Sequence, residues 1–123
     1  MNELELVAFE IISNVGMAKS LAMEAIREAR NGNFEEAEKK IDEAKVFLLE
    51  GHHAHFDLIQ DEANGKKIEF SLIIMHAEDQ LMSAETIKDL AIELIEMNKE
   101  IKKIIFKQHL IIIFTSNYNI SVK

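Results

Sequence analysis

The sequence contains no cysteine and no proline, and only four of its 123 residues are glycine. Without cysteine, a disulfide framework, a thiolate zinc site and a cysteine nucleophile are all excluded. Proline and glycine are the residues least tolerated inside helices, so their scarcity favours long helices. The length is sufficient for one domain with a real hydrophobic core, and too short for two.

Basic residues are also fewer than acidic residues. Fourteen Lys and Arg face 22 Asp and Glu, and the net charge of −8 argues against nucleic acid and anionic membrane surfaces as partners. The first five residues are acidic where a signal peptide is basic. No uncharged apolar run reaches 18 residues, so we expect no membrane insertion and a cytoplasmic location.

Apolar residues recur at alternating spacings of three and four along most of the chain. This pattern predicts three long helices, at about residues 4–30, 34–63 and 72–107. The connections between them are short, which makes sequential helices antiparallel neighbours. The sequence therefore predicts an all-α fold, an antiparallel three-helix bundle that forms a single domain over residues 1–108.

The helix ends carry local signals. Gly32 suits the left-handed residue after the first helix. Asn33 is predicted to cap the second helix, with Glu36 completing a capping-box pattern, and Ser71 is predicted to cap the third. The tail at 109–123 is β-branched and aromatic, which leaves three possibilities open: a strand, an extended arm on a neighbour, or a poorly specified tail.

A polar stripe interrupts the apolar start of the third helix. His76, Asp79, Gln80 and Ser83 lie at spacings that share one helix face. Polar groups in apolar surroundings are paired or functional, because burying them bare costs several kcal/mol. Imidazole is a competent nucleophile towards phosphorus, so His76 is the candidate for phosphoryl transfer. The plainer alternative is that His76 and Asp79 form a helix-surface pair.

A second group of histidines lies in the second helix. His52 and His55 are three residues apart, a spacing that metal pairs on helices use, but a tetrahedral site needs three or four ligands. We favour a polar pocket lining beside another helix. A metal site within one subunit, formed by His52, His55, His76 and Asp79, remains an alternative.

At these residues the sequence resembles the enzyme IIA component of the lactose/cellobiose class of the bacterial sugar phosphotransferase system. The signature of that family is His-Gly/Ala-Gln-Asp-His-Leu-Met, and here residues 76–82 read His-Ala-Glu-Asp-Gln-Leu-Met. The likeness continues through Phe-Glu-Ile-Ile at 9–12, Asn-Gly-Asn-Phe at 31–34 and Glu-Ala-Asn-Gly at 62–65. It spans roughly residues 4 to 105, with matching order and spacing.

The resemblance implies a specific role for each matched residue. Subunits of the family associate as homotrimers, which are nine-helix assemblies. His76 would accept phosphate from the phosphocarrier HPr and pass it to the cysteine of enzyme IIB, which serves the membrane component enzyme IIC. Asp79 would meet its two symmetry mates at the trimer axis around a divalent metal, Mg²⁺. Gln80, His52 and His55 would form the supporting pocket.

The motif departs from the family at two positions. Glu78 replaces a Gln, and at two residues from His76 its carboxylate should point away from the imidazole. Gln80 replaces the second His, and an amide cannot carry a proton or a positive charge. The alternative function is therefore a helical regulatory or interaction module that no longer accepts phosphate.

Overall fold

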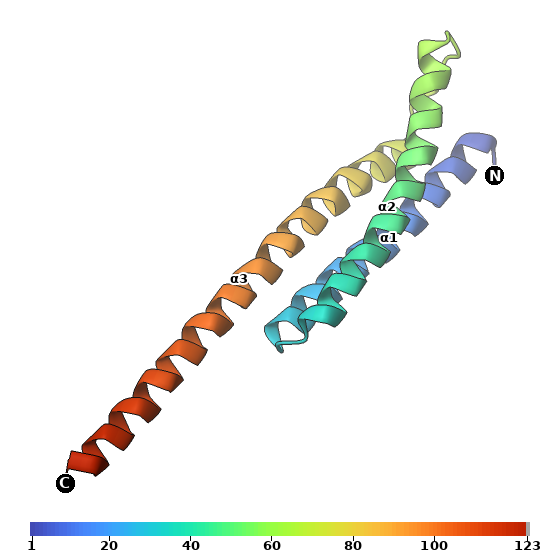
Figure 1. Cartoon of the computed structure of the whole chain (residues 1–123). Coiled ribbons are helices and arrows are strands. Elements are labelled where there is room, and N and C mark those ends of the chain that lie inside the picture. The colour runs from blue at the N-terminus through green and yellow to red at the C-terminus, as the bar shows by residue number, and fades with distance from the viewer. Residues whose placement is uncertain (123) are drawn as a thin grey trace.

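The computed structural model describes residues 1–122, which form three helices: α1 (Glu3–Arg30), α2 (Phe34–Ala63) and α3 (Leu72–Val122). α1 and α2 form an antiparallel hairpin, and the first half of α3 packs beside it (Figure 1). No strand occurs among these residues. The predicted all-α, three-helix architecture is confirmed.

The core consists largely of alanine. α1 packs along both other helices, whereas α2 and α3 contact each other much less. The predicted apolar seam of α1 is buried from Ala8 to Ala29, and small side chains allow its neighbours to approach closely. At Gly51 the three helices converge, since a Cβ there would lie 3.2 Å from Val15 Cγ2 and 3.4 Å from Leu81 Cδ1. Glycine thus allows a close approach of the three helices, and a Cβ at this position would require Val15 or Leu81 to shift by a few tenths of an ångström.

Two of the predicted helix-end signals hold and one does not. Gly32 adopts a left-handed φ of 83° after α1. Ser71 Oγ accepts a hydrogen bond from the Ile74 amide at 3.3 Å, as expected of an N-cap. The predicted capping box at Asn33 is wrong, because that side chain makes no cap bond and its Nδ2 instead donates to Glu28 Oε2 at 2.8 Å.

The third helix is much longer than the sequence pattern predicted. It does not end near Lys107 but continues to Val122, so the strand, the extended arm and the poorly specified tail are all wrong for residues 109–122. Lys123 lies outside the described residues. The physical reason is the absence of Pro and Gly after Gly65, because isoleucine costs an α-helix only a few tenths of a kcal/mol per residue.

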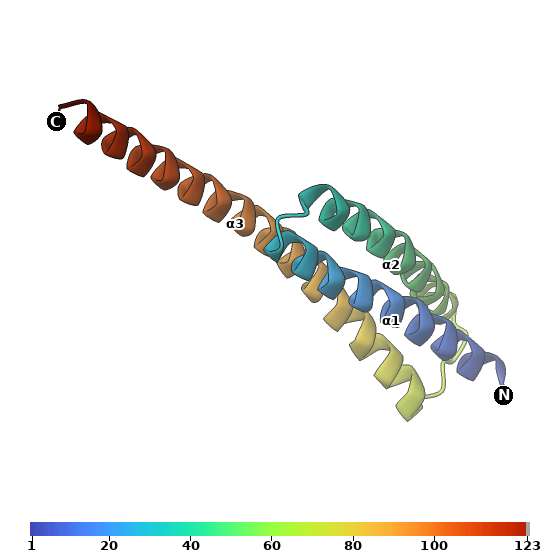
Figure 2. The same cartoon turned by 90° about the horizontal axis from the view of Figure 1, so that it is seen from below.

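The C-terminal half of α3 leaves the bundle. Figures 1 and 2 show it extending past the turn that joins α1 to α2, with no helix beside it. Every residue from Ile101 to Ser121 is exposed. Near this point Lys102 still contacts the bundle, with its Nζ 5.3 Å from the ring centroid of Phe34. The core therefore belongs to α1, α2 and the first half of α3.

Among residues 1–122, α1 alone is long and apolar enough to cross a membrane, judged by length and composition. The same test is met by core helices of soluble proteins, and α1 contributes eight buried residues to the core. One helix of this kind is weak evidence for a membrane span.

Candidate functional site around His76

His76 lies in the second turn of α3 with its side chain exposed. The next residue, Ala77, and Leu81 one turn later are buried against the bundle, and this fixes the rotation of the helix. Asp79 is exposed as well, and Gln80 is partly buried. The structure thus presents an imidazole on an open surface, where another macromolecule could reach it.

Glu78, the first departure from the family motif, is held away from His76. Its Oε2 lies 2.5 Å from Nδ1 of His55 on α2, and both side chains are about two-thirds buried. The contact has ion-pair distance but not hydrogen-bond geometry, and this buried ring nitrogen has no hydrogen-bond partner in the described chain. The added carboxylate is therefore committed to the α2–α3 interface, as its spacing from His76 predicted.

His52 has a carboxylate partner of its own. Its Nε2 donates a hydrogen bond of 2.5 Å to Glu85 Oε1, and Lys88 Nζ lies 2.9 Å from the other oxygen of the same carboxylate. These three side chains line a small pocket between α2 and α3. Of the predicted pocket residues, His52 lines it, whereas His55 and Gln80 do not. They form a polar clasp, the His52–Glu85–Lys88 group, between two helices that otherwise touch little.

The ionised forms of Glu85 and Lys88 are stabilised by the polar and charged groups around them. Burial by itself raises the pKa of Glu85, but the hydrogen bonds from His52 and Lys88 and the positive charge of Lys88 outweigh it, so the pKa falls below the ordinary 4.5. The pKa of Lys88 is raised by its bonds to Asp89 and Glu85. A carboxyl group with a lowered folded-state pKa adds stability above its unfolded pKa, and this is lost as pH falls through the folded value.

We therefore expect Glu85→Gln to lower the free energy of unfolding by about 1 kcal/mol at neutral pH. This value is the usual contribution of a charged hydrogen bond, reduced because the group is partly exposed to solvent. The loss should disappear below the lowered pKa of Glu85, where the wild-type carboxyl is itself protonated. Urea unfolding across pH at one protein concentration measures both effects. Glu93→Gln, at an exposed position of the same helix, is the matched control, and an equal loss in both variants would contradict the clasp.

The histidine partners were missed at the sequence level, although a signal was present. Glu78 and Glu85 are seven residues apart on one face of α3, and His52 and His55 are three apart on one face of α2. In an antiparallel helix pair, the first glutamate of α3 lies opposite the second histidine of α2, and the second glutamate lies opposite the first histidine. The structure shows this pairing, with Glu78 at His55 and Glu85 at His52. The spacings are compatible with this pairing but do not establish it, because it also depends on the register of α2 against α3.

The single-subunit metal site is not formed. No group of three or more His, Asp or Glu side chains suited to a metal ion occurs among residues 1–122. His52 and His55 are engaged by Glu85 and Glu78, so they do not join His76 and Asp79 as ligands. The alternative of a metalloprotein complete within one chain is wrong.

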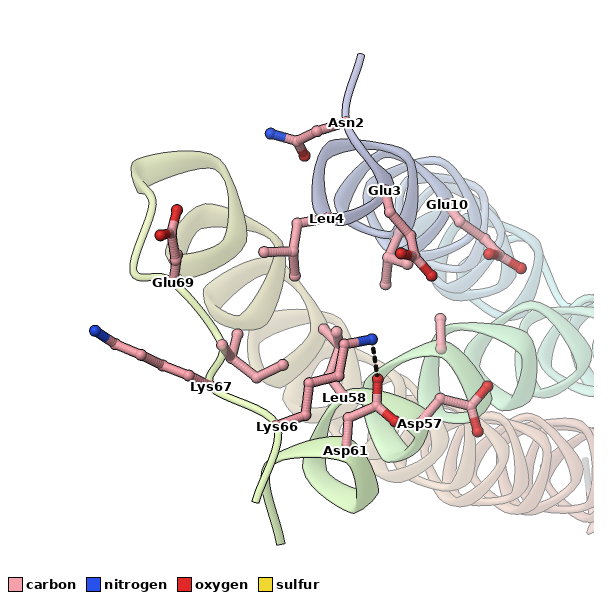
Figure 3. A pocket seen from close by; sticks show the side chains of 13 residues that line it. Asn2, Glu3, Leu4, Glu10, Asp57, Leu58, Asp61, Lys66, Lys67 and Glu69 are labelled. Carbon is pink, nitrogen blue, oxygen red and sulfur yellow. Dashed lines mark hydrogen bonds and ion pairs between the residues drawn. The ribbon is translucent and has the colours of Figure 1, made fainter. Parts of the chain in front are cut away.

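A cleft of about 440 Å³ opens near the N-terminus of α1, between α1, the end of α2 and the loop before α3 (Figure 3). Its lining is mixed: apolar residues such as Leu58 and Ile68 lie beside several carboxylates and two lysines, and Lys66 Nζ is paired to Asp61 at 2.9 Å. His76, Asp79 and Gln80 do not line it. The cleft is therefore separate from the exposed surface that carries the motif.

The fold and the motif together define a small helical protein with an exposed histidine on its third helix. Residues 6–99 match the family model described as "PTS system, Lactose/Cellobiose specific IIA subunit". The chain belongs to this family of the sugar phosphotransferase system, and it is a phosphotransferase component that carries phosphate during sugar uptake of the lactose/cellobiose type.

Individual relatives agree with the family match. The chain is 46% identical over 99 residues to the lichenan-specific phosphotransferase enzyme IIA component of Bacillus subtilis, which covers 80% of this chain and 90% of the relative. It resembles the crystal structure of the cellobiose-specific enzyme IIA from Bacillus anthracis with a TM-score of 0.82 and 42% identity, over 84% of this chain and 94% of that one.

A third relative was solved together with a partner. The solution structures of the IIA(Chitobiose)–HPr complex of the N,N'-diacetylchitobiose branch of the Escherichia coli phosphotransferase system match with a TM-score of 0.72 and 35% identity. They cover 83% of this chain and 99% of that one. The family model ends at residue 99 and so leaves the end of α3 unmatched.

Proposed function

We propose that His76 is the residue that carries the phosphate. The observation that supports this assignment is the exposure of its side chain within the motif at 76–82, directly beside the buried Ala77. An imidazole nitrogen attacks the phosphorus of the donor, a nitrogen–phosphorus bond forms, and the bond from phosphorus to the donor breaks. Because Glu78 is committed to His55, its charge does not oppose the incoming phosphate at His76.

We propose HPr as the phosphate donor, since the E. coli relative was solved in complex with HPr. The acceptor would be the cysteine of an enzyme IIB, which in turn serves a membrane enzyme IIC. The location that this exchange requires is the cytoplasm. The regulatory module without phosphate acceptance gains no support from Glu78, because that carboxylate is turned into the α2–α3 interface.

The test is a reconstituted relay. Incubation of the chain with phosphoenolpyruvate, enzyme I and HPr should add one phosphoryl group, measured by intact mass, and acid should remove it. Addition of enzyme IIB should then discharge the chain and load the IIB cysteine. A chain that binds HPr but gains no phosphate would establish the regulatory alternative instead.

We propose further that the chain works as a homotrimer whose axis lies along α3. The exposed side of α3 supports this proposal, because its apolar residues share a face with Asp79. Leu90 is 56% exposed and Met97 57% exposed, and Met97 follows Asp79 by 18 residues, which is about five helical turns. A face of this kind is covered when copies of the helix pack together.

Asp79 would then face its two symmetry mates. One chain supplies a single exposed carboxylate here, so a metal site would require three copies. Carboxylate oxygens are the ligands that Mg²⁺ prefers, so the donor type fits the proposed ion. Bound at the axis, Mg²⁺ would offset two of the three negative charges of the carboxylates.

We expect Asp79→Leu to leave a folded oligomer, because a cluster of desolvated charges can often be replaced by apolar packing without loss of stability. Sedimentation velocity of the variant, with and without Mg²⁺, measures this. The wild-type chain under the same conditions is the reference. Dissociation of the variant to monomers would show instead that the metal holds the assembly together.

A further inference from the structure

The C-terminal segment of α3, residues Ile104–Ser121, has no role in the proposed phosphate transfer. It begins beyond the family match, which ends at residue 99, and it projects from the bundle (Figure 2). Its large apolar side chains are all exposed, from 49% at Ile105 to 75% at Phe114. Exposed apolar surface of this extent marks an interaction site.

Apolar side chains surround this segment rather than forming a stripe. Successive helical residues are about 100° apart, so Ile104 and Ile113 point to opposite sides, as do Ile112 and Phe114. All four are more than half exposed. A helix that is apolar all round needs an environment that covers its whole circumference.

A second copy of the chain covers only part of this surface. The exposed seam of α3 continues at spacings of three and four through Ile101 and Ile104, and its next members are Gln108, Ile111 and Thr115. Polar residues at alternate seam positions weaken a coiled coil. Helix packing along that seam would also leave Ile113, on the opposite side, in water.

The positive charge of the C-terminal segment indicates the kind of partner that it binds. Residues 101–123 contain four lysines and no acidic residue, in a chain whose net charge is −8. Lys103 and Lys107 stand at the start of the apolar segment, where long side chains can reach a headgroup layer while the helix lies in apolar surroundings. The strongly acidic character of the chain is thus confined to the bundle, and its projecting end is basic.

We propose that residues Ile104–Ser121 enter the headgroup layer and the adjoining acyl region of an anionic lipid membrane, which enclose the helix on all sides, and hold the phosphocarrier bundle beside the membrane. The segment is not a membrane span, since α1 alone passes that test among the described residues. Apolar contact supplies binding, and the lysines supply the preference for negative headgroups.

The experiment is flotation of the full chain on a density gradient with vesicles of phosphatidylcholine alone or with added phosphatidylglycerol. Vesicle-bound protein rises, whereas aggregates remain below. We expect the amount of chain that floats with the anionic vesicles to be at least about tenfold the amount that floats with phosphatidylcholine alone. This amount should decrease as the salt concentration rises. Ile112→Glu with Phe114→Glu should abolish flotation, and Lys103→Gln with Lys107→Gln should remove the preference for phosphatidylglycerol.

The matched control is Val46→Glu, an exposed apolar position on α2 at 60% exposure, which should float like the wild type. Thermal unfolding by circular dichroism checks that every variant remains folded. The proposal is overturned if the wild type stays below with anionic vesicles, or if the double glutamate variant floats equally well. It is also overturned if the substitutions at residues 112 and 114 change the size of the oligomer in the absence of vesicles, because the segment then binds a second copy of the chain. Phosphate transfer in the relay is measured separately, so either proposal can fail alone.

Discussion

His76→Gln is expected to abolish phosphate uptake completely. Glutamine keeps the length and hydrogen-bonding capacity of the side chain, but its amide nitrogen is not a nucleophile towards phosphorus. His76 is exposed, so the substitution should leave the fold and the melting temperature unchanged. Intact mass after incubation with phosphoenolpyruvate, enzyme I and HPr measures the result directly.

His53→Gln is the matched control for this experiment. His53 is an exposed histidine of α2 and should remain dispensable for phosphate uptake. An undiminished phosphate mass on His76→Gln, or its loss on His53→Gln, would show that another residue carries the phosphate. Phosphate that survives acid treatment would also contradict a phosphohistidine, whichever variant carries it.

Leu81→Ala is expected to cost about 2–5 kcal/mol of unfolding free energy, which is the usual range for a buried leucine that leaves a cavity. Leu81 is 1% exposed and lies next to Gly51, where the three helices meet. With small alanines elsewhere in the core, few neighbouring side chains can move in to fill the space. Urea unfolding followed by circular dichroism, at one fixed protein concentration, measures the loss.

The neighbouring Met82 offers the control for this prediction. It is 65% exposed in the chain, so Met82→Ala should change the unfolding free energy of the subunit by well under 1 kcal/mol. If Met82→Ala were the more damaging of the two, the rotation of α3 against the bundle would be wrong. The trimer face would then have to be assigned again, because the same rotation places Asp79.

Periodicity was sufficient for most of the fold. The alternation of apolar residues identified three helices and the buried face of α1, because side chains on one helix face recur every three or four residues whatever the helix packs against. It failed at the end of α3, where a run of isoleucine and phenylalanine is compatible with a strand or a helix. Asn33 is the N-cap residue of α2 as predicted, but the capping-box hydrogen bonds are absent, and its side chain donates to the carboxylate of Glu28 instead.

For the site, the residues by themselves made His76 the candidate nucleophile, and the resemblance of its motif to a known family indicated a phosphotransferase component. Only the tertiary structure decided what surrounds it: Glu78 is bound by His55, Glu85 by His52, and the end of α3 stands free of the bundle. The physical reason is that spacing along one helix defines a face, whereas contacts between helices depend on their mutual rotation and register.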